Sequence, residues 1–128
     1  MKTTLKKISI ATAIILTSQL ALAAEIIEKP SKVKKAIANT TIDFSGGKGA
    51  VVEYFAADGT ARGRSNKNGV FTGKWFVRPD ATLCVVHDDP NQSGCVFVLR
   101  RKHEIEFHRF DDVLEGPFPI VKGNPNRL

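Results

Sequence analysis

Short apolar runs separated by turn signals follow one another from residue 41 to residue 110, and this spacing limits the fold more than any other feature. Asp58-Gly59 and Asn68-Gly69 are dipeptides typical of tight β-hairpins, and Pro79-Asp80 marks a further turn. Runs at intervals of about ten residues, joined by hairpins, are typical of all-β domains. The sequence therefore predicts a mainly β fold, a small antiparallel up-and-down β-barrel or curled sandwich of roughly seven or eight short strands with one short N-terminal helix.

The apolar runs predict strands at 41–44, 50–56, 60–64, 70–78, 81–87, 95–100 and 103–110. The next apolar stretch contains Pro117 and Pro119, so an edge strand or an irregular segment is expected there. Within 70–78, alternation places Trp75 on one face with Gly73. We expect Trp75 to be buried in the core, with its indole N–H hydrogen-bonded and its ring in the space that Gly73 leaves.

Residues 1–23 have the three parts of a secretory signal peptide. Three lysines stand in the first seven residues, Ile8–Leu16 is apolar, and Ala21-Leu22-Ala23 is an A-x-A cleavage signal. The apolar run is shorter than the roughly 20 residues that a membrane-spanning helix needs. The sequence therefore predicts an exported protein that begins near Ala24 and has no membrane span.

The rest of the chain is predicted to form one domain. Residues 24–30 are expected to be a disordered N-terminus and residues 31–128 a single β domain. Ser31 is the expected N-cap of a helix over 32–38, in which Val33 and Ile37 share one face. So short a helix must dock to persist, and we expect it to cover one end or one face of the sheet.

Two cysteines lie in apolar surroundings of an exported chain. Cys84 and Cys95 therefore predict a disulfide. The alternative is a reactive thiol with His87 as its base. In a strand, however, the three-residue spacing from Cys84 to His87 points the two side chains to opposite faces.

The charge of the chain does not favour nucleic acid. Without the three leading lysines, 16 Lys and Arg stand against 13 Asp and Glu, a net charge of +3. Basic runs occur at 32–35 and at 100–102, and the simplest interpretation of both is a solvated surface. We expect no nucleic-acid partner, since the chain lacks a sustained basic face.

No catalytic or metal-binding motif is evident, so we expect a protein that is not an enzyme and has no cofactor. His103 and His108 are five apart on a predicted strand, whereas the zinc protease motif needs two histidines four apart on a helix. No serine lies in a G-x-S-x-G motif. Asp88-Asp89 with Asn91 offers weak calcium ligands, although a carboxylate-rich turn is the commoner structure.

The aromatic residues are most simply core. If the barrel is wide enough, some of them would line a cavity for a small apolar ligand. The candidates for lining such a cavity are Tyr54, Phe71, Trp75 and Phe97.

Several short motifs together resemble a family of small exported proteobacterial proteins known only as a domain of unknown function. The motifs are Asn39-Thr40, Tyr54-Phe55, Asp58-Gly59-Thr60 with Gly63, Gly73 with Trp75, Leu83-Cys84, Cys95-Val96-Phe97 and Gly123-Asn124. The resemblance covers nearly all of the chain after the signal peptide. It implies a periplasmic or secreted protein of a Gram-negative bacterium with a disulfide, and it brings no known activity or functional residue.

The function expected from these observations is a binding or interaction module. We expect a monomer whose partner is an unknown protein or a small apolar ligand. An alternative is an inhibitor of an envelope-directed enzyme such as lysozyme, since such inhibitors are also small, exported, disulfide-containing β domains. An uncharacterised enzyme is the third hypothesis. Fold analogy alone is a weak basis for choosing among them.

Overall fold

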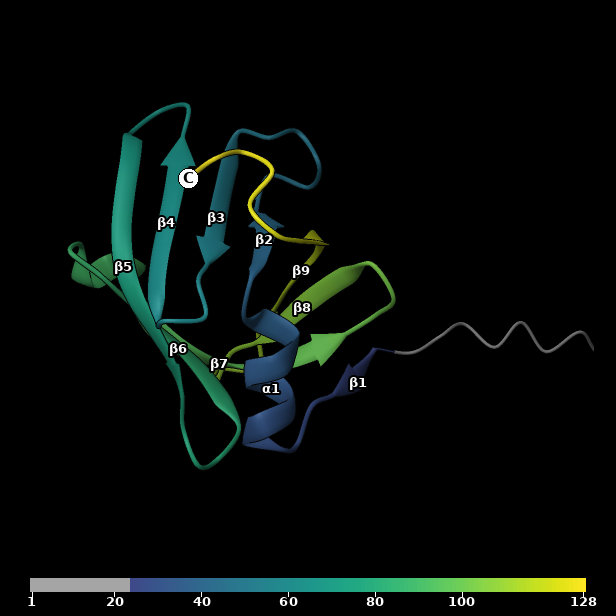
Figure 1. The fold of residues 1–128 in the computed structure, drawn as a ribbon. Coiled ribbons are helices and arrows are strands. Elements are labelled where there is room, and N and C mark those ends of the chain that lie inside the picture. The colour runs from purple at the N-terminus through teal and green to yellow at the C-terminus, as the bar shows by residue number, and fades with distance from the viewer. Residues whose placement is uncertain (1–23) are drawn as a thin grey trace, which may run out of the picture.

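The computed structural model describes residues 24–128, so the predicted signal peptide at 1–23 lies outside the described residues. Within 24–128 the chain forms nine strands, one α-helix and one 3-10 helix (Figure 1). The helices are α1 (Pro30–Ile37) and η1 (Pro90–Gln92). The strands are β1 (Glu25–Ile26), β2 (Thr40–Asp43), β3 (Val51–Phe55), β4 (Thr60–Ser65), β5 (Gly69–Val77), β6 (Thr82–His87), β7 (Gly94–Arg100), β8 (Glu104–His108) and β9 (Leu114–Lys122).

Strands β2 to β9 form a closed antiparallel barrel. Each pairs with the next along the chain, and β9 also pairs with β2, where Ile42 is opposite Ile120. The eight-strand barrel in residues 24–128 is therefore an up-and-down meander, as predicted, and not a sandwich. β1 is an additional strand, which pairs with the end of β7. Full closure leaves no free edge among the eight barrel strands.

The core fills the barrel interior because side chains alternate between its two faces. Phe55, Leu83, Val98 and Ile105 are almost completely buried there. We call the end where β3, β5, β7 and β9 finish the closed end, because α1 lies against it, at the lower end of the barrel in Figure 1. We call the opposite end of the barrel the open end.

The helix α1 seals the closed end, which confirms the expected docking. Its side chains Val33 and Ile37 are completely buried in the barrel core. At its C-terminus, the Thr40 hydroxyl donates a 2.6 Å hydrogen bond to the Ile37 carbonyl. The helix starts at Pro30, and the N-cap is Lys29, which makes no side-chain cap, so Ser31 is not the cap that was predicted.

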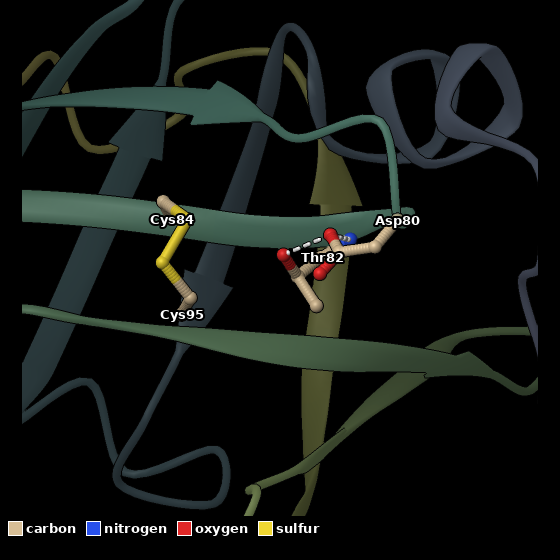
Figure 2. Close-up of a disulfide and its surroundings, with 4 residues drawn as sticks. All are labelled: Asp80, Thr82, Cys84 and Cys95. Atoms are coloured by element: carbon tan, nitrogen blue, oxygen red, sulfur yellow. Dashed lines mark hydrogen bonds between the residues drawn. A yellow bond between two sulfur atoms is a disulfide. The ribbon is translucent and has the colours of Figure 1, made fainter.

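The predicted disulfide is present and joins neighbouring strands. Cys84 of β6 is directly opposite Cys95 of β7, and their sulfur atoms are bonded (Figure 2). Both side chains lie on the outer face of the barrel, because the register pairs Leu83 with Val96 on the inner face. Just before β6, the Asp80 carboxylate accepts a 2.6 Å hydrogen bond from the Thr82 hydroxyl, which fixes the start of this strand.

Two predictions about the ends of the chain need correction. Residues 24–30 were predicted to be disordered, but Glu25–Ile26 forms β1 and Pro30 begins α1. The stretch with two prolines is not an edge, because β9 lies between β2 and β8 and closes the barrel, although its pairing with β8 shifts register between Ile105 and Phe107. β2 pairs only with residues 120–122, so its ladder does not need the N–H that Pro119 lacks.

Trp75 is buried, as expected, at the closed end. Its indole N–H donates a 2.8 Å hydrogen bond to the Ala56 carbonyl, and its ring packs edge-on against Phe55. The space at Gly73, however, is not used by Trp75. A Cβ atom at Gly73 would lie 2.9 Å from the His87 ring and 2.6 Å from the Val86 carbonyl oxygen. The small residue therefore makes room for the next strand and its histidine.

None of the helices in residues 24–128 is long and apolar enough to cross a membrane.

Candidate ligand-binding site at the open end of the barrel

A cavity of about 640 Å³ occupies the open end of the barrel. Its apolar wall includes Phe44, Val51, Phe55, Phe71, Leu83, Val85, Val96 and Phe107. The β6–β7 loop and the β8–β9 loop form its rim, with Ser93, Arg109 and Glu115. The volume lies within the range of roughly 300–1,000 Å³ that is typical of sites for small molecules.

The cavity wall contains a pair of ionisable groups, a buried glutamate and a partly buried histidine. Glu53 of β3 is only 4% exposed, and its Oε1 atom lies 2.7 Å from Nε2 of His87, at the end of β6. Both side chains point inward because the register places Glu53 on the face of Ile42 and Gly63, and His87 on the face of Val85. The pair therefore connects strands that are not neighbours, across the inside of the barrel.

The β6–β7 loop holds His87 in place. Its Nδ1 atom lies 2.7 Å from the Gln92 carbonyl oxygen. Its backbone N–H donates a 2.9 Å hydrogen bond to the Ser93 hydroxyl. The loop is itself ordered by η1, whose N-cap Asp89 accepts a hydrogen bond from the Asn91 backbone N–H. The acidic turn that suggested weak calcium ligands thus shapes the loop that orients the histidine.

The hydrogen bonds define where the protons of this pair are. A carbonyl oxygen can only accept, so Nδ1 of His87 carries a proton and donates it to Gln92. The contact between Nε2 and Glu53 must then contain a second proton, on either the imidazole or the carboxyl group. The second oxygen of Glu53, Oε2, has no hydrogen-bond partner among residues 24–128, so it is free to accept a donor from the cavity.

The pKa values of both groups are shifted upward. Burial raises the pKa of Glu53, and the hydrogen bond and charge of His87 only partly oppose this. Burial alone would lower the pKa of His87, but hydrogen bonds to Glu53 and Gln92, with the charges of Glu53 and Asp88, outweigh it. The folded protein therefore holds a proton on this pair more tightly than the unfolded chain does.

Two glycines create the space for the aromatic part of the site. A Cβ atom at Gly63 would lie within 2.0 Å of the Phe71 ring, so this ring lies directly over the β4 backbone. Gly73 similarly accommodates the His87 ring. The two rings then meet edge to face, with centroids 5.5 Å apart. The glycines of β4 and β5 thus allow Phe71 and His87 to lie side by side in the cavity wall.

Of the four aromatic residues proposed to line a cavity, the structure places one in this site. Phe71 lines the cavity. Trp75 is in the core at the closed end. Tyr54 and Phe97 are on the outer face, where the Tyr54 hydroxyl lies 3.2 Å from Asn39 Oδ1 and Phe97 packs against Phe110.

The sequence interpretation did not single out Glu53, and it considered His87 only as a base for Cys84. A local signal for Glu53 exists, because alternation puts this carboxylate on the same face as Val51 and Phe55. A charged residue on an apolar strand face suggests a buried role. His87 shows the same signal, because alternation puts it on the strand face of Leu83 and Val85.

Among residues 24–128 there is no group of three or more His, Cys, Asp or Glu side chains that could hold a metal ion. What the site offers a ligand is a buried carboxylate oxygen of Glu53 that accepts a hydrogen bond, a proton shared between Glu53 and His87, and an apolar wall.

Comparison with known proteins adds no assignment, since no protein-family model, curated protein or solved structure matches this chain. The resemblance to a family of small exported proteins stays a prediction.

Proposed function

We propose that the protein is a binding module whose open end takes a small, mainly apolar ligand with one hydrogen-bond donor. The observation that carries the proposal is the Glu53–His87 pair, whose carboxylate is buried in a cavity wall that is otherwise mostly apolar. Removing a charged group from water costs several kcal/mol, so such a pair is unlike the remainder of the barrel core.

The free oxygen of Glu53 determines which ligands fit best. Oε2 accepts but does not donate while the carboxylate is ionised, so an N–H or O–H group of the ligand is the complementary partner. The aromatic wall, including Phe71, favours a flat apolar body that packs against ring faces and edges. A ligand with an aromatic body and one amine or hydroxyl group satisfies both requirements.

We also propose that the protein is exported. Its disulfide supports this proposal, since stable disulfides are typical of oxidising compartments such as the periplasm and the extracellular space. Intact-mass measurement of protein from a periplasmic extract should give a species that lacks Met1 to Ala23. A stable product that retains Lys2 would contradict the proposal.

Binding can be tested with N-phenyl-1-naphthylamine, an apolar fluorophore that has a single N–H donor. We expect a saturable rise in its fluorescence at one probe per protein. Glu53→Gln should weaken binding roughly ten-fold, the equivalent of a hydrogen bond to a charged group worth about 1.4 kcal/mol. The measurement is a fluorescence titration at constant pH and salt.

Two control variants locate the probe. Val51→Trp adds bulk at the cavity mouth and should abolish binding, whereas Glu104→Gln removes a carboxylate far from the cavity and should change nothing. Near-ultraviolet circular dichroism checks that each variant is folded. Absence of saturable binding, or equal binding by the Val51→Trp variant, would rule out the cavity as the ligand site.

A second candidate is a protein partner, as in the enzyme-inhibitor hypothesis. The β8–β9 loop and the start of β9 expose three apolar side chains, Phe110 (62%), Val113 (45%) and Leu114 (55%). A protruding apolar loop is typical of surfaces that dock on other proteins. A lysozyme activity assay with excess protein tests this candidate directly, and Phe110→Ser should then relieve any inhibition.

A further inference from the structure

A second concave surface lies at the closed end of the barrel. It is a groove of about 950 Å³ between α1, β1 and the β7–β8 turn, which we call the basic groove. One side is lined by Lys29, Lys32 and Lys35 and the other by Arg100, Arg101 and Lys102. Two basic runs that are far apart in the sequence therefore face one groove. In Figure 1, α1 and β1 lie beside each other next to the end of β7.

The charge of the groove differs from that of the rest of the molecule. With Lys122, seven cationic side chains line it against two carboxylates, those of Glu25 and Glu28. This excess of five exceeds the net charge of +3 for the whole chain after Ala23, so the rest of that chain carries a net charge of −2. The positive charge is thus concentrated at one place, and it attracts an anionic partner.

The lysines of the groove are free, whereas its arginines are engaged. Arg101 forms a 3.0 Å ion pair with the buried carboxylate of Glu106, and Arg100 donates to the Ala36 carbonyl at 3.4 Å. The five lysines are exposed and form no ion pair within residues 24–128. Most of the available charges are therefore the point charges of lysines, which lack the planar fork that binds phosphate groups in a bidentate manner.

The uncharged part of the groove favours a polypeptide as the partner. Its floor is apolar, with Ile26 (48% exposed), Ile27 and Ala36, and it contains no aromatic side chain on which a nucleic-acid base would stack. A concave surface suits a chain better than a flat bilayer. In addition, β1 pairs only with β7, so its other edge has backbone groups without a strand partner among the described residues.

We propose that the basic groove binds an acidic segment of a partner polypeptide, with carboxylates on the lysines and an apolar side chain on Ile26 and Ile27. The site is distinct from the cavity, which is at the opposite end of the barrel. A weak, fast and salt-dependent interaction is expected, because the lysines are exposed and their attraction is screened by ions.

The test is fluorescence anisotropy with a labelled twelve-residue peptide of alternating Glu and Leu and the full mature protein. We expect binding at low ionic strength that weakens at least ten-fold when salt is raised from 0.05 to 0.5 M. The triple variant Lys32→Gln/Lys35→Gln/Lys102→Gln should lose at least ten-fold in affinity. Its matched control, Lys48→Gln/Lys67→Gln/Lys74→Gln, removes the same charge away from the groove and should retain affinity within two-fold.

Several outcomes would overturn the proposal. Equal losses in the two triple variants would mean that only net charge matters. Tighter groove-dependent binding of a twelve-nucleotide single-stranded DNA, or of phosphatidylglycerol vesicles, would assign the groove to a nucleic acid or a membrane instead. Absence of peptide binding at low salt would also exclude the site. The groove variant should bind N-phenyl-1-naphthylamine as the parent does, so this proposal and the cavity proposal fail separately.

Discussion

The two ends of the barrel are made by the same strands but differ in how their interiors are filled. At the closed end, Val33 and Ile37 of α1 are completely buried beside Trp75 and Phe55. At the open end the interior is hollow, and the Glu53–His87 pair is in its wall. The closed end thus resembles an ordinary close-packed core, whereas the open end keeps space and polar groups that a core does not need.

This difference suggests a division of roles along the barrel axis. Dense apolar packing at the closed end supplies stability through burial and contact. The open end gives up part of that stabilisation and retains a preorganised polar pair on rigid strands, which is the arrangement that a binding site requires. Substitutions at the two ends should therefore have effects of different size and kind.

The largest effect is expected for Trp75→Ala at the closed end. The change removes a buried aromatic ring and its hydrogen bond to Ala56, so it should lower the free energy of unfolding by about 3–5 kcal/mol. Urea denaturation measures this directly. The neighbouring Phe76 is 50% exposed on the outer face, so Phe76→Ala should cost less than about 1 kcal/mol. A native Trp75 that iodide quenches readily would contradict the closed-end core.

The disulfide should have the next largest effect. Replacing Cys84 and Cys95 by serine removes a cross-link between β6 and β7 and should cost about 2–3 kcal/mol, mainly by freeing the unfolded chain. The measurement is the free energy of unfolding from urea denaturation, and the slope should rise because the unfolded chain exposes more surface without the cross-link. Thiol labelling of the unfolded, unreduced parent should find no free cysteine, and two labelled thiols would show that the cross-link does not form.

Gly73→Ala tests how tightly the open end is built. The added Cβ would meet the Val86 carbonyl oxygen at 2.6 Å, so backbone must move, and we expect a loss of about 1–3 kcal/mol. The movement should also displace His87 and weaken probe binding in the cavity. Gly94→Ala is the matched control, because nothing lies within 4 Å of a Cβ atom at that glycine. Equal stability of the two variants would show that β5 and β6 are not packed as described.

The smallest effect is a dependence of stability on pH. Because the pKa values of Glu53 and His87 are both raised on folding, their contribution is complete below the ordinary values of 4.5 and 6.5 and is lost as pH rises through the folded values. In the window above these ordinary values, this contribution to stability should therefore fall. The carboxylate of Asp80 affects stability only below this window. Its pKa is lowered from 3.8 by its hydrogen bonds to Thr82, so its contribution to stability is lost as pH falls through the lowered value.

The double variant Glu53→Gln/His87→Gln should make the urea midpoint less dependent on pH over this window. Glu104→Gln, on the outer face, should keep the slope of the parent. A double variant with the same slope as the parent would mean that the shared proton does not couple to folding.

Local features of the sequence were sufficient for most elements of the fold. The hairpin turns at Asp58-Gly59 and Asn68-Gly69, the alternation that buries Trp75, and the pairing of Cys84 with Cys95 each depend on a few neighbouring residues. The closing strand was mispredicted because the local rule for proline was outweighed by pairing with both β2 and β8. A strand that completes a barrel gains more stability by pairing with two neighbouring strands than it loses at its two proline positions.

The candidate sites were decided by the tertiary structure alone. Glu53 and His87 are 34 residues apart and meet only because the closed barrel turns both inward at one end. The basic runs at 32–35 and 100–102 face one groove only because α1 docks beside the end of β7. Strand register and closure arise from contacts distant in the chain, whereas turn chemistry and alternation are local. The sequence by itself therefore determined the strands from β2 to β8, while the tertiary structure determined the closing strand and which side chains act together.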